Sequence, residues 1–285
     1  MKSTTKLREL MKSDRITVSA CGYDALSMCL IEAAGFETAT SSGFGIHGSM
    51  LGTPDTGLLT LSEVVEALGK MVAAVDIPII ADGESGYGNA INVMRMVREY
   101  EKCGVTGLFF EDQKIPPNCP FYKETQLITK DEMVGKIEAA CEARTDPDFF
   151  IIARTDAKGF DETVERLSAY VEAGADSVLL IPNEIETLEK IPSIIKVPVS
   201  VTFEGARTVK PGITVSDLEK MGYSSAGFTF TALLANAKNT LETLKIVREA
   251  GTDIAASEQL MPIEEYFMLV QGAKYLALED KYLRG

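Results

Sequence analysis

Three apolar runs in this chain end directly in a charged residue. The charged residues are Asp82, Glu111 and Arg154, and the runs before them are residues 79–81, 108–110 and 149–153. A charge is rarely placed at the end of a buried run unless it is paired or binds a ligand. Three successive runs of this kind predict one shared site that contains acidic groups and a guanidinium.

The acidic groups at this site offer only oxygen ligands. Asp82, Glu84 and Glu111 lie at or just after strand candidates, and Asp55 lies in a Gly/Ser-rich loop. Oxygen ligands suit a hard divalent cation, Mg2+ or Mn2+, that keeps several of its waters. With His47 as its single histidine, the chain excludes a multi-histidine metal site. The alternative is a set of solvated or ion-paired carboxylates at the starts of loops.

Arg154 has two interpretations. Its guanidinium is suited to bind a carboxylate or to stabilise an oxyanion that forms during a reaction. The structural alternative is an ion pair with Asp156 or Glu111.

Two loops carry further candidates. Residues 41–57 are expected to form a Gly/Ser-rich loop, whose backbone N–H groups are able to hold an anion. His47 in this loop is interpreted as a surface or second-layer residue rather than as a base. Residues 112–130 form a long loop with three prolines, and loops of this length are usually functional or disordered. Cys119 lies in it, as an acid, a nucleophile or a residue without a role.

The elements that position these residues alternate between strand and helix. Strands are expected at residues 16–20, 37–40, 77–82, 105–111, 149–154, 177–181, 197–201 and 225–228. Helical periodicity separates them, and Ser62 is expected to cap the helix before the third strand. Eight apolar strands that alternate with helices favour an α/β protein with a closed (β/α)8 TIM barrel and an active site at the carboxyl ends of its strands. No GxGxxG follows the first strand, which weighs against a dinucleotide-binding fold.

Composition argues against several classes of function. The chain has 285 residues and a net charge of −14, which disfavours nucleic acid as a partner. It has no membrane-spanning stretch, and residues 1–15 lack the apolar core of a signal peptide. Five cysteines without a CxxC motif predict free thiols in a reducing cytoplasm. We expect a barrel with a short N-terminal helix at residues 1–250 and a C-terminal helical extension at residues 251–285.

Six segments, in order, resemble the isocitrate lyase/phosphoenolpyruvate mutase superfamily. They are Tyr23-Asp24-Ala25-Leu26-Ser27, Ser42-Gly43-Phe44, Leu51-Gly52-Thr53-Pro54-Asp55, Asp82-Gly83-Glu84-Ser85-Gly86-Tyr87-Gly88-Asn89, Glu111-Asp112-Gln113 and Ala153-Arg154-Thr155-Asp156-Ala157. The length is similar to that of the smaller members, methylisocitrate lyase and phosphoenolpyruvate mutase. Superfamily members act on 2-oxo acids or release them, through a Mg2+-bound enolate of pyruvate or a close relative.

The resemblance implies a role for each acidic residue and for the oligomer. Asp82 would ligate Mg2+ directly, while Glu84, Glu111 and Asp55 would hold its waters. The protein would be a homotetramer, a dimer of dimers that exchange the last barrel helix, with the C-terminal tail packed on the partner. Mn2+ remains a possible substitute for Mg2+.

The resemblance also assigns the residues that handle the substrate. Ser42, Gly43 and Phe44 would offer backbone N–H groups to the pyruvate carboxylate. The remaining roles are Arg154 at the enolate oxygen, Tyr23 in the pocket wall, Cys119 as the loop acid and Glu204 among the substrate-binding residues.

The departures from the superfamily pattern concentrate in the distal half of the site. The second acidic residue of the metal motif is usually Asp, but here it is Glu84. Lyases carry Lys-Arg-Cys-Gly-His in the loop, where this chain has Pro117-Asn118-Cys119-Pro120-Phe121, so the cations beside the thiol are gone. Mutases usually have Lys where Gln113 stands. In the seventh strand, Val201 replaces the lyase Asn, so a contact to the distal carboxylate is expected to be lost.

The leading hypothesis is a Mg2+-dependent carbon–carbon lyase. It would cleave a methylisocitrate-like 2-hydroxy polycarboxylate through a metal-bound enolate, giving pyruvate or a related 2-oxo acid. The alternatives are a phosphoenolpyruvate/phosphonopyruvate mutase or hydrolase, and an oxaloacetate-type decarboxylase or hydrolase. A barrel that binds a 2-oxo acid without turnover is a further alternative, because the loop is so altered.

Overall fold

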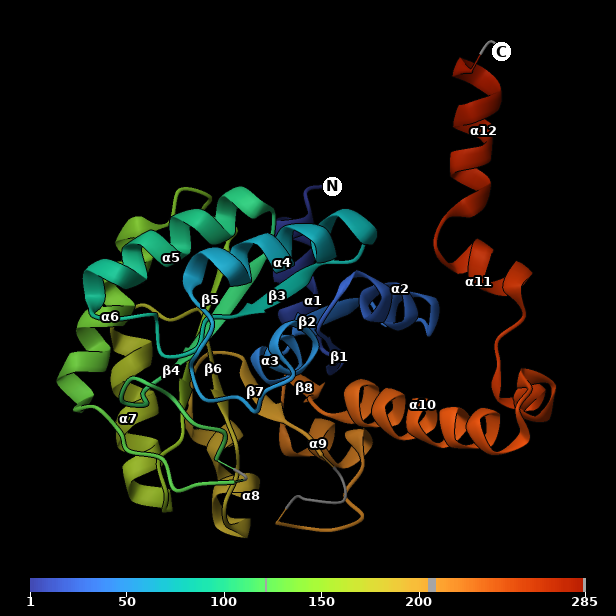
Figure 1. Ribbon diagram of the computed structural model, residues 1–285. Helices are drawn as coiled ribbons and strands as arrows, with labels where there is room; N and C mark the ends of the chain where they lie inside the picture. The colour runs from blue at the N-terminus through green and yellow to red at the C-terminus, as the bar shows by residue number, and fades with distance from the viewer. Residues whose placement is uncertain (121, 205–208, 284–285) are drawn as a thin grey trace.

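The computed structural model of the protein describes residues 1–120, 122–204 and 209–283, so Phe121 of the long loop lies outside the described part. Eight parallel strands close into a barrel in chain order with helices around it, which confirms the predicted (β/α)8 barrel (Figure 1). The strands are β1 Thr17–Gly22, β2 Thr38–Ser41, β3 Ile79–Asp82, β4 Gly107–Glu111, β5 Phe150–Thr155, β6 Ser177–Leu180, β7 Val199–Thr202 and β8 Ser225–Phe228.

The register of the strands brings the charged residues to one end of the barrel. β1 pairs with both β2 and β8, which closes the sheet. Between β4 and β5, Glu111 pairs with Arg154, and between β3 and β4, Asp82 pairs with Phe109. Because parallel strands share their carboxyl ends, three neighbouring strands deliver charges to the same place, as predicted.

Helices surround the barrel and extend beyond it. They are α1 Ser3–Met11, α2 Ala25–Ala33, α3 Gly43–Leu51, α4 Leu61–Ala74, α5 Ala90–Cys103, α6 Lys130–Ala143, α7 Phe160–Glu172, α8 Ile185–Ile194, α9 Val215–Met221, α10 Thr231–Ala250, α11 Ile263–Leu269 and α12 Gly272–Tyr282, with a 3-10 helix η1 at Asp253–Gln259. The expected cap at Ser62 is wrong, because Thr60 caps α4. Its side chain accepts the Glu63 N–H, and Glu63 accepts the Thr60 N–H in return.

The segment 41–57 is not a loop throughout, since α3 forms within it. Ser42 is the N-cap and accepts the Gly45 N–H at 3.0 Å, while Gly52 ends the helix in a left-handed conformation. Three glycines lower the local helix propensity, so the sequence indicated a loop. Burial of Ile46 and His47 against the barrel overrides that preference.

The N-terminal helix α1 closes the amino end of the barrel. Its Leu7 and Met11 pack on a cluster inside the barrel made of Ile80, Phe109, Phe150 and Ile152. Arg8 beside them donates to Asp148 O and to Asp176 Oδ1, both at 3.0 Å, just before β5 and β6 begin. A second and larger core lies between the strands and the outer helices. The carboxyl end of the barrel therefore remains available for the site.

The C-terminal part of the chain leaves the barrel. After β8, α10 runs outward, and η1, α11 and α12 continue away from it (Figure 1). α10 buries none of its residues, and large apolar side chains are exposed along this arm: Leu234, Leu241, Leu244, Ile254, Ile263, Phe267 and Met268. The division at residue 250 and the exchange of a helix between subunits stay predictions. No helix of the described chain is long and apolar enough to cross a membrane.

Candidate active site

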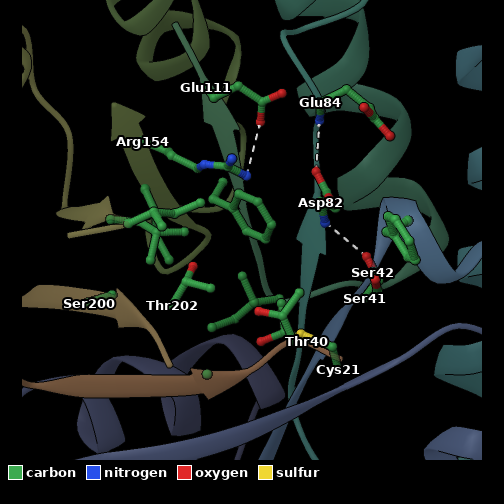
Figure 2. A pocket seen from close by; sticks show the side chains of 18 of the residues that line it. Cys21, Thr40, Ser41, Ser42, Asp82, Glu84, Glu111, Arg154, Ser200 and Thr202 are labelled. Carbon is green, nitrogen blue, oxygen red and sulfur yellow. Dashed lines mark hydrogen bonds and ion pairs between the residues drawn. The ribbon is translucent and has the colours of Figure 1, made fainter. Parts of the chain in front are cut away.

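One large cavity lies at the carboxyl ends of the strands. Its volume is about 920 Å3, including space open to solvent. Eight of the predicted site residues line it: Ser42, Phe44, Asp55, Asp82, Glu84, Glu111, Cys119 and Arg154. Figure 2 shows the carboxylates of Asp82, Glu84 and Glu111 along one side, with Arg154 facing Glu111. The structure thus brings together residues that lie more than a hundred positions apart in the sequence.

The turn after β3 is strained and firmly held. Glu84 and Tyr87 have φ of 51° and 56°, a left-handed conformation that side chains other than Gly, Asn and Asp rarely adopt. Such strain persists only where the surroundings enforce it, and it is common at functional sites. Here the Glu111 N–H donates to Glu84 O at 2.9 Å, which ties the turn to the end of β4.

Two residues that the sequence patterns did not reveal bind the same turn from the outer helices α5 and α6. The Tyr100 hydroxyl of α5 donates to Asp82 O at 2.7 Å, and the Lys136 ammonium of α6 donates to Ser85 O at 3.0 Å. Lys136 is almost fully buried, and burial lowers its pKa. The sequence does carry a signal for Lys136, because a lysine is unexpected among the apolar positions of α6 between Met133 and Ala140. Tyr100 gave none, because it matches the apolar periodicity of α5.

Asp82 is held by the backbone on both of its oxygens. Oδ1 accepts the Glu84 N–H and Oδ2 accepts the Gly43 N–H, each at 3.0 Å. A Cβ atom on Gly43 would lie 2.4 Å from Glu84 Oε1 and 2.9 Å from Asp82 Oδ2. Only glycine therefore lets the N-terminus of α3 approach these carboxylates so closely.

The carboxylates that surround Asp82 are not fully satisfied within the described protein. Asp55 Oδ1 and Glu84 Oε1 are buried and accept no hydrogen bond. Burial and then neighbouring carboxylates raise the pKa of Glu84 well above its ordinary value, and the same causes raise the pKa of Asp55 to about 6. Buried acceptors without donors, crowded by like charges, fit a cation between them. The donor set is mainly oxygen, as a hard divalent ion requires.

His47 belongs to this cluster but is poorly placed to act as a ligand. Its ring lies with Asp55 and Glu84 in a group whose possible ligand atoms are within 4.8 Å of one another. However, Nδ1 lies 2.9 Å from the Gly43 carbonyl, and Nε2 accepts the Leu59 N–H at 3.3 Å. These partners occupy both ring nitrogens of the neutral imidazole. His47 is fully buried, so the surface interpretation is wrong, and its hydrogen bonds assign it to the layer behind the carboxylates.

Arg154 combines the structural and the functional interpretation. Nε and Nη2 donate to Asp156 in a bidentate pair with both distances at 2.9 Å, while Nη1 lies 3.5 Å from Glu111 Oε2. Burial by itself would lower the pKa of Arg154, but Asp156, Glu111 and Asp82 raise it, so the guanidinium stays charged. One edge is therefore held by the protein, and Nη1 is directed toward the carboxylates that line the cavity.

The loop between β4 and α6 covers the cavity. Pro117, Asn118, Cys119 and Pro120 all line it, and Cys119 is only 8% exposed. Beside them, Phe44 makes an edge-to-face contact with Phe230, with ring centroids 5.1 Å apart. The cavity lining therefore includes an apolar part near the covering loop as well as the acidic part formed by the carboxylates.

The predicted anion site at α3 is only partly supported by the hydrogen bonds. The Ser42 N–H already donates to Gly22 O at 2.9 Å, and the Gly43 N–H donates to Asp82. Contact of all three N–H groups with the substrate stays a prediction, and in this structure two of them already donate within the protein.

Three predicted substrate residues, Gly43, Tyr23 and Glu204, lie outside the cavity lining. Tyr23 packs under Gly45, and its hydroxyl accepts a hydrogen bond from Asn236 of α10 at 2.7 Å. The pocket wall expected at Tyr23 is therefore not seen, since that side chain turns toward α10. Glu204 accepts a hydrogen bond from the Phe230 N–H, which ties the ends of β7 and β8 together.

Comparison with known proteins places this arrangement in a family. Residues 7–245 match the sequence model described as phosphoenolpyruvate phosphomutase. The chain is 36% identical to 2,3-dimethylmalate lyase of Eubacterium barkeri over 290 residues, covering both chains fully. The chain belongs to the phosphoenolpyruvate mutase/isocitrate lyase superfamily. This membership confirms the resemblance seen in the sequence motifs.

Other members show how widely the superfamily varies. The chain is 37% identical to 2-methylisocitrate lyase of Aeropyrum pernix over 271 residues, which is 93% of this chain and 86% of that protein. A solved phosphonopyruvate hydrolase in complex with oxalate and Mg2+ superposes with a TM-score of 0.89 and 30% identity, covering both chains fully. The protein is thus an enzyme of a metal-dependent superfamily, and its unsatisfied Asp55 and Glu84 oxygens fit such a metal.

Proposed function

We propose that the protein is a Mg2+-dependent carbon–carbon lyase. It cleaves a 2-hydroxy acid with a second carboxylate two carbons away, and it releases pyruvate or a related 2-oxo acid. The observation that carries this proposal is the cavity itself, where buried carboxylates with unsatisfied oxygens, an arginine held on one edge and a loop thiol meet. The similarity to 2,3-dimethylmalate lyase along the whole chain supports the same reaction class.

The residues of the cavity divide the reaction between them. When bound, the cation supplies positive charge beside the reacting oxygens. The Glu111 carboxylate, which lines the cavity 3.5 Å from Arg154 Nη1 and whose pKa burial raises, accepts the proton of the C2 hydroxyl. Arg154 then stabilises the oxygen that remains on C2, because Nη1 faces the cavity. As that oxygen becomes a carbonyl, the C2–C3 bond breaks, and its electron pair moves to C3 and into the departing carboxylate. Cys119 then donates a proton to C3 from the covering loop.

The walls of the cavity favour a small departing group that carries an alkyl substituent. Arg154 is the one cation among the described residues that line the cavity. Phe44, Phe230, Pro117 and Pro120 supply an apolar wall, which suits methyl groups better than a further carboxylate. An alkylated malate therefore fits this wall better than a tricarboxylate such as methylisocitrate.

A panel assay tests the proposal. The full-length protein is incubated with Mg2+ and with malates that carry 2-methyl, 2,3-dimethyl or no substituents, with methylisocitrate and with oxaloacetate, and released 2-oxo acid is measured. We expect pyruvate from an alkylated malate, and loss of this activity with EDTA. Phosphorus NMR with phosphonopyruvate is the parallel experiment. Turnover of phosphonopyruvate or oxaloacetate alone would replace the lyase by one of the alternatives, and the absence of any turnover would favour a binding protein.

We also propose an oligomer and a reducing compartment for the enzyme. The exposed apolar side chains of α10 and the C-terminal helices support a homotetramer in which this arm packs on a partner. None of the five cysteines forms a disulfide, which agrees with a cytoplasmic location.

A further inference from the structure

Gln113 is a buried residue that lines the cavity, and the proposed reaction gives it no role. It lies two residues beyond Glu111, the last residue of β4, and its exposed fraction is 2%. A buried primary amide needs both hydrogen-bond donors and acceptors around it. The partners of its two ends lie on different elements of the site.

The carbonyl end of Gln113 binds the loop. Its Oε1 accepts the backbone N–H of Asn118 at 2.9 Å, and Asn118 directly precedes Cys119. The base of this loop is a short antiparallel pairing, in which Lys114 N–H donates to Gln126 O at 2.7 Å and Ile128 N–H donates to Asp112 O at 2.9 Å. Gln113 therefore adds a hydrogen bond further along the loop, next to the residue that covers the cavity.

The amide nitrogen of Gln113 binds Asp156, the residue that holds Arg154 in place. Its Nε2 donates to Asp156 Oδ2 at 2.5 Å. The same Asp156 carboxylate holds the Nε and Nη2 atoms of Arg154 at 2.9 Å. Because Asp156 must accept all three hydrogen bonds, a donor at position 113 helps to fix the plane of the carboxylate and hence that of the guanidinium.

We propose that Gln113 is a positioning residue that joins the Cys119 loop and Arg154 into one hydrogen-bonded unit. The unit runs from the Asn118 N–H through the Gln113 amide and the Asp156 carboxylate to the guanidinium. A disturbance at the loop is thereby transmitted to the group that stabilises the reacting oxygen. Glutamine suits this position because it both accepts and donates, whereas lysine only donates and glutamate at neutral pH only accepts.

The first test needs no turnover and measures the loop. Full-length protein with Mg2+ is treated with iodoacetamide, and alkylation of Cys119 is followed by peptide mass spectrometry, with Cys29 and Cys103 as internal references. Gln113→Met removes both ends of the link, and Gln113→Lys keeps only the donor to Asp156. We expect both to raise the Cys119 alkylation rate roughly tenfold, the effect of one lost hydrogen bond on local opening. Gln126→Met, at an exposed glutamine of the same loop, should leave the rate within about twofold.

The second test measures the arginine. Oxalate, which carries two adjacent carboxylates like the planar anions that the site would bind, is titrated calorimetrically in the presence of Mg2+. We expect Gln113→Met to weaken oxalate binding roughly tenfold, and Gln113→Lys to weaken it less than about threefold, since its ammonium still donates to Asp156. With an active substrate, Gln113→Met should lower kcat roughly tenfold to a hundredfold at nearly unchanged KM.

The outcomes separate this inference from the proposed function, on which it relies only for the roles of Arg154 and Cys119. An unchanged Cys119 alkylation rate in folded Gln113→Met overturns the inference whatever the substrate is. Faster alkylation without weaker oxalate binding shows that Gln113 anchors only the loop, and this also overturns the proposed coupling. If Gln113→Met does not fold, the alkylation rate of Gln113→Lys decides in the same way. Failure of the substrate panel with the expected alkylation result contradicts the proposed function alone.

Discussion

At the scale of single residues, the proposed reaction assigns its proton donor to a thiol that the fold places over the cavity. Cys119 is nearly buried among prolines of the loop and lines the same space as Arg154. If it donates the proton to the departing carbanion, Cys119→Ser should lower kcat roughly a hundredfold with little change in KM, because only the transition state loses a proton donor. Steady-state kinetics with the best substrate of the panel measures this.

Cys141→Ser is the matched control for this prediction. That thiol lies on α6, where it donates to Gly174 O, away from the cavity. Its replacement should leave kcat unchanged. An unchanged kcat in Cys119→Ser as well would exclude the loop acid and favour chemistry that needs none, such as decarboxylation.

Glu84 offers a second prediction at this scale, because its carboxylate is buried with an unsatisfied oxygen. In the metal-free protein its charge is repelled by Asp82, Asp55 and Glu111, so Glu84→Gln should raise the melting temperature by roughly 2–4 °C, which corresponds to about 1 kcal/mol. With Mg2+ the variant should instead melt at a lower temperature than the wild type, since it lacks a group proposed to bind the cation or its waters. Thermal melts with EDTA and with Mg2+ measure both effects.

Glu66→Gln serves as the control, because Glu66 is exposed on α4 and forms an ion pair with Lys70 at the surface. It should change the melting temperature by no more than about 1 °C, both with EDTA and with Mg2+. A Glu84→Gln protein that Mg2+ stabilises as strongly as the wild type would contradict the assignment of Glu84 to the metal site.

At the scale of elements, the turn after β3 keeps its strained conformation because α5 and α6 hold it. Tyr100 of α5 donates to Asp82 O at 2.7 Å and lies 3.1 Å from the Tyr87 hydroxyl. Tyr100→Phe should lower the free energy of unfolding by about 1–3 kcal/mol, since a buried carbonyl is left without its donor. It should also lower kcat/KM roughly tenfold, because the turn that carries Asp82 and Glu84 becomes less ordered.

Tyr223→Phe separates these two effects. The Tyr223 hydroxyl is also buried and donates to a helix carbonyl, Leu188 O, at 2.9 Å, but it lies outside the cavity lining. The two variants should therefore lose similar stability in denaturant titrations, and only Tyr100→Phe should lose activity. Equal kcat/KM values for both variants would show that the hydrogen bond to the turn is structural only.

At the scale of the whole molecule, the C-terminal arm predicts an oligomer. α10 buries none of its residues, and Leu241 and Leu244 are 56% and 59% exposed. An apolar surface of this kind is usually covered by a partner in solution. We expect a homotetramer by light scattering at micromolar concentration, and a smaller species for the double variant Leu241→Glu and Leu244→Glu, which places charges in the contact.

Ile91→Glu is the control for the oligomer, because Ile91 is 70% exposed on α5 of the barrel. This variant should keep the size of the wild-type assembly. A monomeric wild-type protein at micromolar concentration would refute the oligomer.

The sequence by itself determined the barrel and the acidic end of the site. The strands are apolar runs bounded by charge and glycine, and because this pattern is local, it predicts that Asp82, Glu111 and Arg154 meet at one end of the sheet. Glycine and asparagine signals are equally local: Asn89 caps α5, and Gly104 ends it in a left-handed conformation. The motifs also identify the superfamily, because their order along the chain is itself specific.

Only the tertiary structure decided the contacts between elements that are distant in sequence. α3 forms in spite of its glycines because the barrel buries Ile46 and His47, and no local pattern shows that burial. Lys136 reaches a turn 51 residues away. Gln113 meets Asp156 only because the register of β4 and β5 brings their carboxyl ends together. Side-chain partners of this kind depend on packing geometry, which hydrophobic periodicity does not encode.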